Sequence, residues 1–233
     1  MIYKYTKIGA FHKERGAENE DAVRSASGSR YTVIALADGV SSCARAKEGA
    51  AAAADAVTSL YAENGAVFFG SDTQSLKRIT MSHALYHVKE KAKQIGCDVA
   101  DCSSTLSSAV YDRKKNKILY FNVGDAVILG VKKDSLRVLA QPYASDADGT
   151  CVLTTEGAQA AADGKVIDAD GYNAIMICSD GAWKKMYRFG YPKAEVRSFL
   201  VKNDFKKLNS YLAQQENEDD CSYIAFTTRH RKN

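Results

Sequence analysis

Two stretches of the chain decide its fold, Val33-Ile34-Ala35-Leu36-Ala37-Asp38-Gly39 and Ala174-Ile175-Met176-Ile177-Cys178-Ser179-Asp180-Gly181. In each stretch, five apolar residues lead to an Asp-Gly pair. An apolar run of this length that stops at a turn signal predicts a buried strand. The aspartate then places a carboxylate at the rim of the core, and the glycine lets the backbone approach a ligand closely.

The remaining apolar patterns predict an α+β fold. Strand-like runs are Tyr31–Ala37, Thr105–Tyr111, Ile118–Val123, Val127–Val131, Leu136–Ala140, Thr150–Thr154, Ala174–Cys178 and Tyr223–Thr228. Helix-like stretches are Ala44–Glu63, Gln74–Ile95, Lys193–Lys202 and Asp204–Glu216. The short spacing of strands between residues 104 and 140 is typical of antiparallel hairpins. We therefore expect an α+β sandwich in which helices cover the faces of the sheets.

The composition is ordinary for a globular protein, and we expect a cytoplasmic location by default. The chain has 233 residues, 45% of them apolar, and only two prolines, so we expect one domain over residues 1–233. It has no apolar run of the roughly 18 residues that a membrane span needs, and no secretory leader. The net charge of +4, part of it in a basic tail at 229–233, is too small to indicate nucleic-acid binding. The six cysteines include no Cys-x-x-Cys pair, which favours reduced structural thiols over a zinc site.

Acidic residues recur at the ends of the expected strands. They are Glu20, Asp21, Asp38, Asp125, Asp180, Asp219 and Asp220. One Asp-Gly pair is weak evidence for a site, because both residues are common in turns. Several carboxylates around one sheet repel one another unless a cation lies among them, and hard divalent cations prefer oxygen ligands. The pattern predicts a magnesium or manganese site.

The order of these segments resembles the metal-dependent (type 2C, PPM) serine/threonine protein phosphatases, in particular their divergent bacterial branch. The resemblance runs from about Gly9 to Phe226. Its motifs are Asn19-Glu20-Asp21-Ala22, Ala37-Asp38-Gly39-Val40, Ser103-Ser104-Thr105-Leu106, Val123-Gly124-Asp125, Cys178-Ser179-Asp180-Gly181-Ala182-Trp183 and Asp219-Asp220-Cys221-Ser222. It implies a four-layer αββα sandwich, a central antiparallel β-sandwich flanked by helices.

The resemblance also implies two Mg²⁺ or Mn²⁺ ions and a set of ligands. The implied ligands are Glu20, Asp21, Asp38, the Gly39 carbonyl, Asp125, Asp180 and Asp219. Asp38 would bridge the two ions, and Asp125 would lie where some bacterial relatives hold a weaker third ion. A water that bridges the ions would attack the phosphorus of phosphoserine or phosphothreonine in a protein, without a phosphoenzyme. By analogy the phosphoprotein is the product of a bacterial serine/threonine kinase, and we expect a monomeric enzyme.

The chain departs from the family pattern in two places. Ser41 and Ser42 stand where relatives often have paired glycines, which is tolerable if both serines avoid positive φ. The phosphate-binding arginine is expected at the position of Gly16. We assign its role to Arg15, because a guanidinium suits phosphate, although a solvated loop residue is the alternative.

Three interpretations are left open by the sequence. His12 is a candidate acid that protonates the leaving alkoxide, although a lone histidine is more often a packed or surface residue. The expected catalytic residues are thus Asp38, Asp180, Arg15 and His12. A pseudo-phosphatase that binds a partner without turnover is the alternative function: the missing arginine favours it, and the complete acidic set disfavours it. Residues 141–173 fit either a mobile insert at the site or an ordinary connection.

Overall fold

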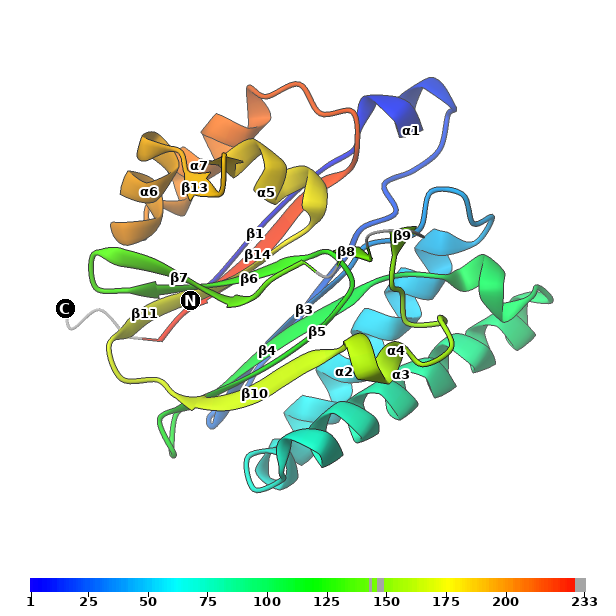
Figure 1. The fold of residues 1–233 in the computed structure, drawn as a ribbon, viewed down its shortest axis with the longest axis horizontal. Helices are drawn as coiled ribbons and strands as arrows, with labels where there is room; N and C mark the ends of the chain where they lie inside the picture. The colour runs from blue at the N-terminus through cyan, green and yellow to red at the C-terminus, as the bar shows by residue number, and fades with distance from the viewer. Residues whose placement is uncertain (143, 146–148, 229–233) are drawn as a thin grey trace.

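The computed structural model describes residues 1–142, 144–145 and 149–228, and its framework is a pair of five-stranded antiparallel sheets (Figure 1). The first sheet has the spatial order β1 (Ile2–Lys7), β14 (Cys221–Thr227), β11 (Tyr172–Cys178), β6 (Val127–Lys132) and β7 (Ser135–Ala140). The second has the order β10 (Asp163–Asp168), β5 (Lys117–Val123), β4 (Leu106–Asp112), β3 (Tyr31–Ala37) and β2 (Ala22–Ser27).

Helices cover the outer face of each sheet. The long helices α2 (Ala46–Phe68) and α3 (Thr73–Ile95) lie on the second sheet, and α5 (Asp180–Met186), α6 (Ala194–Val201) and α7 (Phe205–Ala213) lie on the first (Figure 1). Shorter elements are α1 (Ala10–Glu14), the 3-10 helix η1 (Val99–Cys102), α4 (Ala158–Ala161) and the strand pairs β8 (Ala144–Ser145) with β9 (Gly149–Thr150) and β12 (Tyr187–Arg188) with β13 (Tyr191–Pro192). The four-layer αββα sandwich is therefore confirmed.

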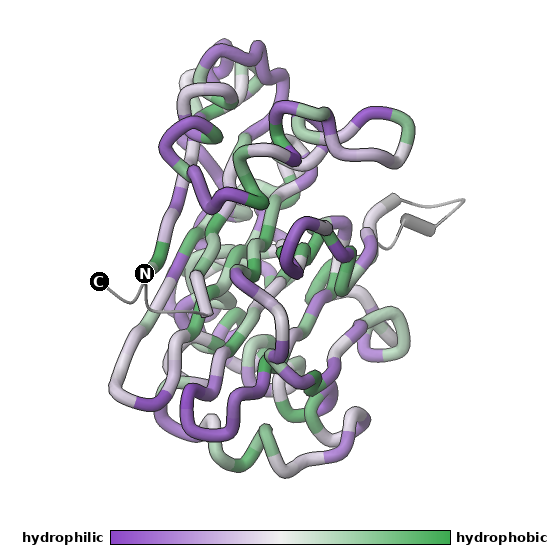
Figure 2. The backbone as a smooth tube through the Cα atoms, turned by 90° about the vertical axis from the view of Figure 1, so that its left-hand side faces the viewer, coloured by the Kyte–Doolittle hydropathy of each residue, from purple (hydrophilic) through white to green (hydrophobic). Residues whose placement is uncertain are grey.

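The continuous apolar runs are explained by burial on both faces of the strands. In β3, Ile34 and Leu36 pack between the two sheets, whereas Val33 and its alternating neighbours face α2. In β11, Ile175 and Ile177 pack between the sheets, and the opposite face of the strand meets the helices α5 to α7. Figure 2 shows the same distribution, with hydrophobic residues along the central strands and hydrophilic residues mainly on outer turns. Neither face of these strands meets water, so neither shows polar alternation.

Helix α2 runs beyond its expected end at Glu63. Ala50, Ala53 and Ala54 are fully buried, and their small side chains let the helix pack closely on the second sheet. Asn64 has non-helical angles, φ −116° and ψ 15°, yet the helix resumes and continues to Phe68. Phe68 is buried in the same core, so tertiary packing extends the helix past a weak position.

Most differences from the sequence prediction lie at the edges of the sheets. The strands β1, β2 and β10, which were not expected, are all edge strands. The predicted strand Thr150–Thr154 is wrong beyond Thr150. In that segment Leu153 is buried, and its N–H donates to the carbonyl of Ser104. The segment is therefore anchored by one buried apolar side chain and is not a strand.

Some expectations fall outside these observations. The basic tail 229–233, and residues 143 and 146–148 of the acidic connection, lie outside the described residues. Within the part that is described, no helix combines the length and the apolar character that crossing a bilayer requires. The six cysteines are free thiols, as expected.

Candidate metal centre

Antiparallel pairing gathers the acidic strand ends at one end of the sandwich. Ala22, at the start of β2, pairs with Ala37 at the end of β3, which places Asp21 beside Asp38. Cys178, at the end of β11, pairs with both Tyr223 of β14 and Val127 of β6. The positions that follow β11, precede β14 and precede β6 therefore meet. This topology explains why residues that lie 200 positions apart in sequence converge.

Four of the predicted aspartates line one cavity of about 430 Å³, which we call the acidic cavity. Its lining residues are Asp38, Gly39, Val40, Ser41, Ser42, Thr105, Asp125, Thr150, Val152, Asp180 and Asp219. Thr150 and Val152 belong to the acidic connection, so the described part of that connection lies at the edge of the site. The Thr150 hydroxyl donates to Asp125 Oδ2 at 2.8 Å.

Asp38 is held in place by the segment Ser103–Thr105. The Asp38 N–H donates to Thr105 Oγ1 at 2.9 Å, and the Thr105 N–H donates to the Asp38 carbonyl at 2.8 Å. Gly39 forms an isolated bridge with Ser104, and the Val40 N–H donates to the Ser103 carbonyl at 3.1 Å. These bonds continue the pairing of β3 and β4 beyond the strands. They fix the loop without using the Asp38 carboxylate, which is left for a ligand.

The second Asp-Gly pair is fixed by a close approach to the start of β14. A Cβ atom on Gly181 would lie 2.1 Å from the Asp220 carbonyl oxygen, so a side chain there would collide with backbone. The Ser179 N–H donates to the Ser222 carbonyl at 2.9 Å, and the Ser222 N–H donates to Ser179 Oγ at 3.0 Å. The glycine thus permits Asp180 and Asp219 to share one wall of the acidic cavity.

The carboxylates of this region repel one another. Burial, followed by the charges of Asp21, Asp180, Asp125 and Asp219, raises the pKa of Asp38 well above its ordinary value. Burial and the neighbouring carboxylates, Asp220 first among them, raise the pKa of Asp21 to about 8. Burial also raises the pKa of Glu20, Asp125 and Asp219. A site with this many acidic groups favours either bound protons or a cation.

The donor set fits a divalent cation. Both carboxylate oxygens of Asp21 and Asp180 Oδ1 are buried without a hydrogen-bond partner among the described residues. Buried carboxylate oxygens without partners are costly, and oxygen-only donor sets suit Mg²⁺ and Mn²⁺. Among the described residues, no three His, Cys, Asp or Glu side chains lie close enough together to hold a metal ion.

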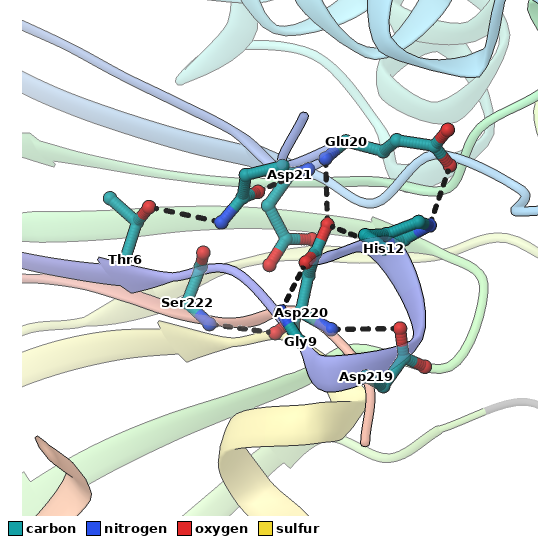
Figure 3. Close-up of polar contacts among 10 residues, drawn as sticks. Thr6, Gly9, His12, Glu20, Asp21, Asp219, Asp220 and Ser222 are labelled. Atoms are coloured by element: carbon teal, nitrogen blue, oxygen red, sulfur yellow. Dashed lines mark hydrogen bonds and ion pairs between the residues drawn. The ribbon is translucent and has the colours of Figure 1, made fainter. Parts of the chain in front are cut away.

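Behind the acidic cavity, Asp220 and His12 join the N-terminal segment to β14 (Figure 3). Asp220 Oδ1 accepts the Gly9 N–H at 2.8 Å, and Oδ2 accepts the Glu20 N–H at 2.7 Å. The His12 ring lies between two carboxylates, with Nδ1 3.0 Å from Asp220 and Nε2 3.4 Å from Glu20. His12 is only 3% exposed, so its position favours a bracing role over contact with a leaving group.

Replacing Asp220 by alanine is expected to lower the free energy of unfolding by about 3 kcal/mol, because two backbone N–H groups lose their acceptor and His12 loses the carboxylate beside its Nδ1. In a chain of this size that loss lowers Tm by roughly 6–12 °C. The fluorescence of Trp183, the sole tryptophan, reports the thermal unfolding. The control Asp55→Ala removes an ion pair with Arg24 in which Asp55 is 60% exposed, so it should cost less than about 1 kcal/mol. Equal Tm values for the two variants would contradict the role of Asp220.

Arg15, the predicted phosphate-binding residue, is not among the residues that line the acidic cavity, and its partner Phe11 lines a neighbouring cavity. Arg15 is exposed, and its guanidinium carbon lies 3.8 Å from the centroid of the Phe11 ring. At Gly16, where the family pattern places an arginine, φ is +66°, a conformation that side chains rarely adopt. The local backbone therefore suits the glycine. Ser41 and Ser42 are not among the described residues with positive φ, so they replace glycines without strain.

Three contributors to the site had no predicted role. Thr105 fixes the Asp38 loop, and Asp220 organises the N-terminal segment. Lys184, on α5, places its Nζ 2.5 Å from Asp180 Oδ2. The signal for Lys184 was its spacing of four residues from Asp180, which puts the two side chains on the same face of a helix.

Comparisons with known proteins agree with this architecture. A family model described as protein phosphatase 2C matches residues 8–220. No curated protein matches the chain at a significant level. The fold is similar to that of Stp1, a serine/threonine phosphatase from Staphylococcus aureus, with 14% identity, a TM-score of 0.73 and coverage of 98% of this chain and 94% of Stp1. It is also similar to PppA, described as a key regulatory component of T6SS in Pseudomonas aeruginosa, with 17% identity, a TM-score of 0.70 and coverage of 97% of this chain and 96% of PppA. A third similar structure is RsbX in complex with magnesium, with 16% identity, a TM-score of 0.61 and coverage of 97% of this chain and 92% of RsbX.

Proposed function

Because the chain belongs to the protein phosphatase 2C family, we propose that it is a metal-dependent phosphatase acting on phosphoserine and phosphothreonine in proteins. One observation carries the proposal: four aspartates from separate strand ends line a single cavity, and further carboxylate oxygens behind it are buried without partners. A structural role does not account for this arrangement, because mutually repelling buried carboxylates destabilise a fold that holds no cation.

The proposed division of roles follows from where each side chain lies. Asp38, at the centre of the repelling group, would contact both ions, with the Glu20-Asp21 pair and the Gly39 carbonyl on one side. Asp180 and Asp219 would hold the other ion, and Asp125 a weaker third ion. When bound, such ions lower the pKa of a water and neutralise charge on a phosphoryl group. The chain's own part is to hold Asp38 through Thr105 and to keep Asp180 and Asp219 together through the contact at Gly181.

The printed descriptions of two relatives support the substrate class and the cofactor. Stp1 is described as a serine/threonine phosphatase, and RsbX was solved with magnesium. We extend both properties to this chain, with Mg²⁺ or Mn²⁺ as the ion and a protein phosphorylated by a bacterial serine/threonine kinase as the substrate. The exposed mouth of the acidic cavity at Asp219 suits a side chain presented on a flexible segment of such a protein.

Phosphate release from a phosphothreonine peptide and from an aryl phosphate tests the proposal. We expect hydrolysis with Mn²⁺ or Mg²⁺ and none in excess chelator, because the carboxylates need the ions to bind a phosphoryl group. Titration calorimetry with Mn²⁺, on the same preparation, should show binding that is lost in Asp180→Asn. A control substitution, Asp55→Ala, lies on an exposed ion pair and should change neither readout.

The same pair of measurements separates the pseudo-phosphatase from the enzyme. Metal binding without hydrolysis of either substrate would favour a module that recognises phosphoproteins without turnover. Absence of both metal binding and hydrolysis would contradict the proposed metal centre. Hydrolysis that persists in chelator would show that the acidic cavity is not the site of the reaction.

A further inference from the structure

The acidic cavity, if it acts as proposed above, must admit an anion of its own sign. A phosphoserine or phosphothreonine side chain carries a charge of about −2 at neutral pH. Its path leads past Asp125, Asp180 and Asp219, which line the cavity. Bound metal ions neutralise part of this charge at their ligands. A cationic side chain that reaches the phosphoryl oxygens from the protein would offset the remainder.

The basic side chains near the cavity differ in what they can reach. His12 is enclosed between Glu20 and Asp220. Arg15 lies over the ring of Phe11. Lys184 instead lies against an aspartate that lines the acidic cavity, with Nζ 2.5 Å from Asp180 Oδ2.

Lys184 also lines a second cavity, of about 400 Å³, that adjoins the first. Ser41 and Asp219 line both cavities, so the two cavities are neighbours. Among the described residues that line either cavity, the basic ones are Lys184 and Lys185. Lys184 therefore lines the cavity next to the acidic cavity and contacts Asp180, which lines the acidic cavity itself.

The backbone of Lys184 is fixed in α5, whereas its side chain is largely exposed to solvent. Lys184 and Asp180 are four residues apart on α5, so they share a helix face. Its side chain is 60% exposed, and the charges of Asp125 and Asp219 act on it as well. A long, flexible ammonium group of this kind can leave one anionic partner for another without movement of the backbone.

We propose that Lys184 binds the phosphoryl group of the substrate and so supplies the cation that the sequence lacks at Gly16. When Asp180 holds a metal ion, Lys184 loses its carboxylate partner and its ammonium turns to the phosphoryl oxygens. Lys184 makes no covalent bond and moves no proton in this role. It contributes charge-assisted hydrogen bonds to the substrate and to the phosphate product.

This role differs in a measurable way from that of a structural ion pair. Lys184 competes with a metal ion for Asp180, but it strengthens the binding of phosphate. Its removal should leave the affinity for metal equal or higher, and should lower the affinity for phosphate. A lysine that only stabilised α5 would produce a lower Tm and a parallel loss of both affinities.

Titration calorimetry with inorganic phosphate, on the full chain saturated with Mg²⁺, measures the predicted difference. We expect Lys184→Met to bind phosphate at least about tenfold more weakly, the effect of losing a charged hydrogen bond. Lys184→Arg keeps the charge and should stay within about threefold of the parent chain. The matched control is Lys207→Met, which removes another helical lysine, paired with Asp204 at 3.2 Å and lining neither cavity. It should leave phosphate binding unchanged.

The outcomes separate this inference from the proposed function. If the parent chain hydrolyses no phosphomonoester, the proposed function fails, while the phosphate affinities still decide the role of Lys184. Equal phosphate affinity in Lys184→Met and the parent chain would overturn the inference, as would absence of phosphate binding in the parent chain. If turnover occurs, Lys184→Met must also lower kcat/KM for the phosphothreonine peptide, and an unchanged value would overturn the inference too.

Discussion

Asp38→Asn is expected to reduce metal-dependent phosphate release by more than about a hundredfold. Residues that only orient metal ligands already cost ten- to a hundredfold when they are replaced, and Asp38 is proposed to contact both ions directly. An amide of the same shape keeps the backbone bonds with Thr105 but removes the negative charge. The measurement is the initial rate of hydrolysis at saturating Mn²⁺, together with Mn²⁺ titration calorimetry.

The same substitution is expected to stabilise the metal-free chain, which distinguishes a functional carboxylate from a structural one. Burial and four neighbouring aspartates raise the pKa of Asp38 well above its ordinary value, so at pH 7.5 folding must either bind a proton or bury a repelled charge. An asparagine side chain is neutral, so folding neither binds a proton nor buries a repelled charge at this position. The expected result is a higher Tm for Asp38→Asn than for the parent chain in excess chelator at pH 7.5.

Asp112→Asn is the matched control, because Asp112 is buried but well paired. Its carboxylate accepts from Arg30 Nη2 at 2.9 Å and from the Lys114 N–H at 2.9 Å. Burial alone would raise the pKa of Asp112, but Arg30 and the backbone donors outweigh it, and the pKa is lowered. Asp112→Asn should therefore destabilise the chain and leave the activity per folded molecule unchanged. Retention of hydrolysis within about tenfold in Asp38→Asn, or a loss of stability as large as that in Asp112→Asn, would contradict the assignment.

The central strands could be predicted from the sequence because burial on both faces requires a continuous run of apolar residues. In β3 and β11 each residue faces either the other sheet or a layer of helices, so the strands read as unbroken apolar runs. The edge strands β1, β2 and β10 have no such run. In β1, Lys4 and Thr6 are exposed and none of the six residues is fully buried, a pattern that loops share.

The site was predictable as a set of strand ends, but the division of work within it was not. Asp219 and Asp220 are adjacent in sequence, and neighbouring side chains near a strand point to opposite sides. One of them had to face away from the cavity; the residue pattern alone does not say which, and only the family resemblance singled out Asp219. The structure turns Asp220 toward Gly9 and Glu20 and leaves Asp219 at the cavity. The N-terminal partners of Asp220 lie 200 or more residues away, beyond the reach of any local pattern.

The position of Arg15 shows a related limit. Arg15 is only one residue along the chain from Gly16. It caps the C-terminal end of α1, and its side chain lies over the ring of Phe11. A helix turns by about 100° at each residue, so adjacent side chains point in different directions. Whether a neighbouring residue can substitute for a missing one depends on this rotation, which only the three-dimensional structure reveals.

The stability of the metal-free chain is expected to fall as the pH rises from about 5 to 8. The unfolded chain ionises its carboxyl groups near pH 4, whereas the folded chain holds Asp21 with a pKa of about 8, raised by burial and by Asp220, Asp180 and Asp219. Between these values the folded state binds more protons, so each pH unit costs up to about 1.4 kcal/mol for each such group. The contribution is fully present below about pH 4 and is lost as the pH passes the folded pKa.

Metal should reverse this trend, because the carboxylates must be deprotonated to act as ligands, so that affinity for metal rises with pH. With Mn²⁺ at about a hundred times its Kd at pH 8, the expected gain is about 2.7 kcal/mol, or roughly 5–10 °C in Tm. At pH 5 the protonated site should gain much less. Urea unfolding at pH 5, 6, 7 and 8, with chelator and with Mn²⁺, measures both slopes, and Asp21→Asn should flatten the slope seen in chelator. A metal-free stability that rises across this range, or a gain from Mn²⁺ that does not change with pH, would mean that the buried carboxylates neither hold protons nor exchange them for metal.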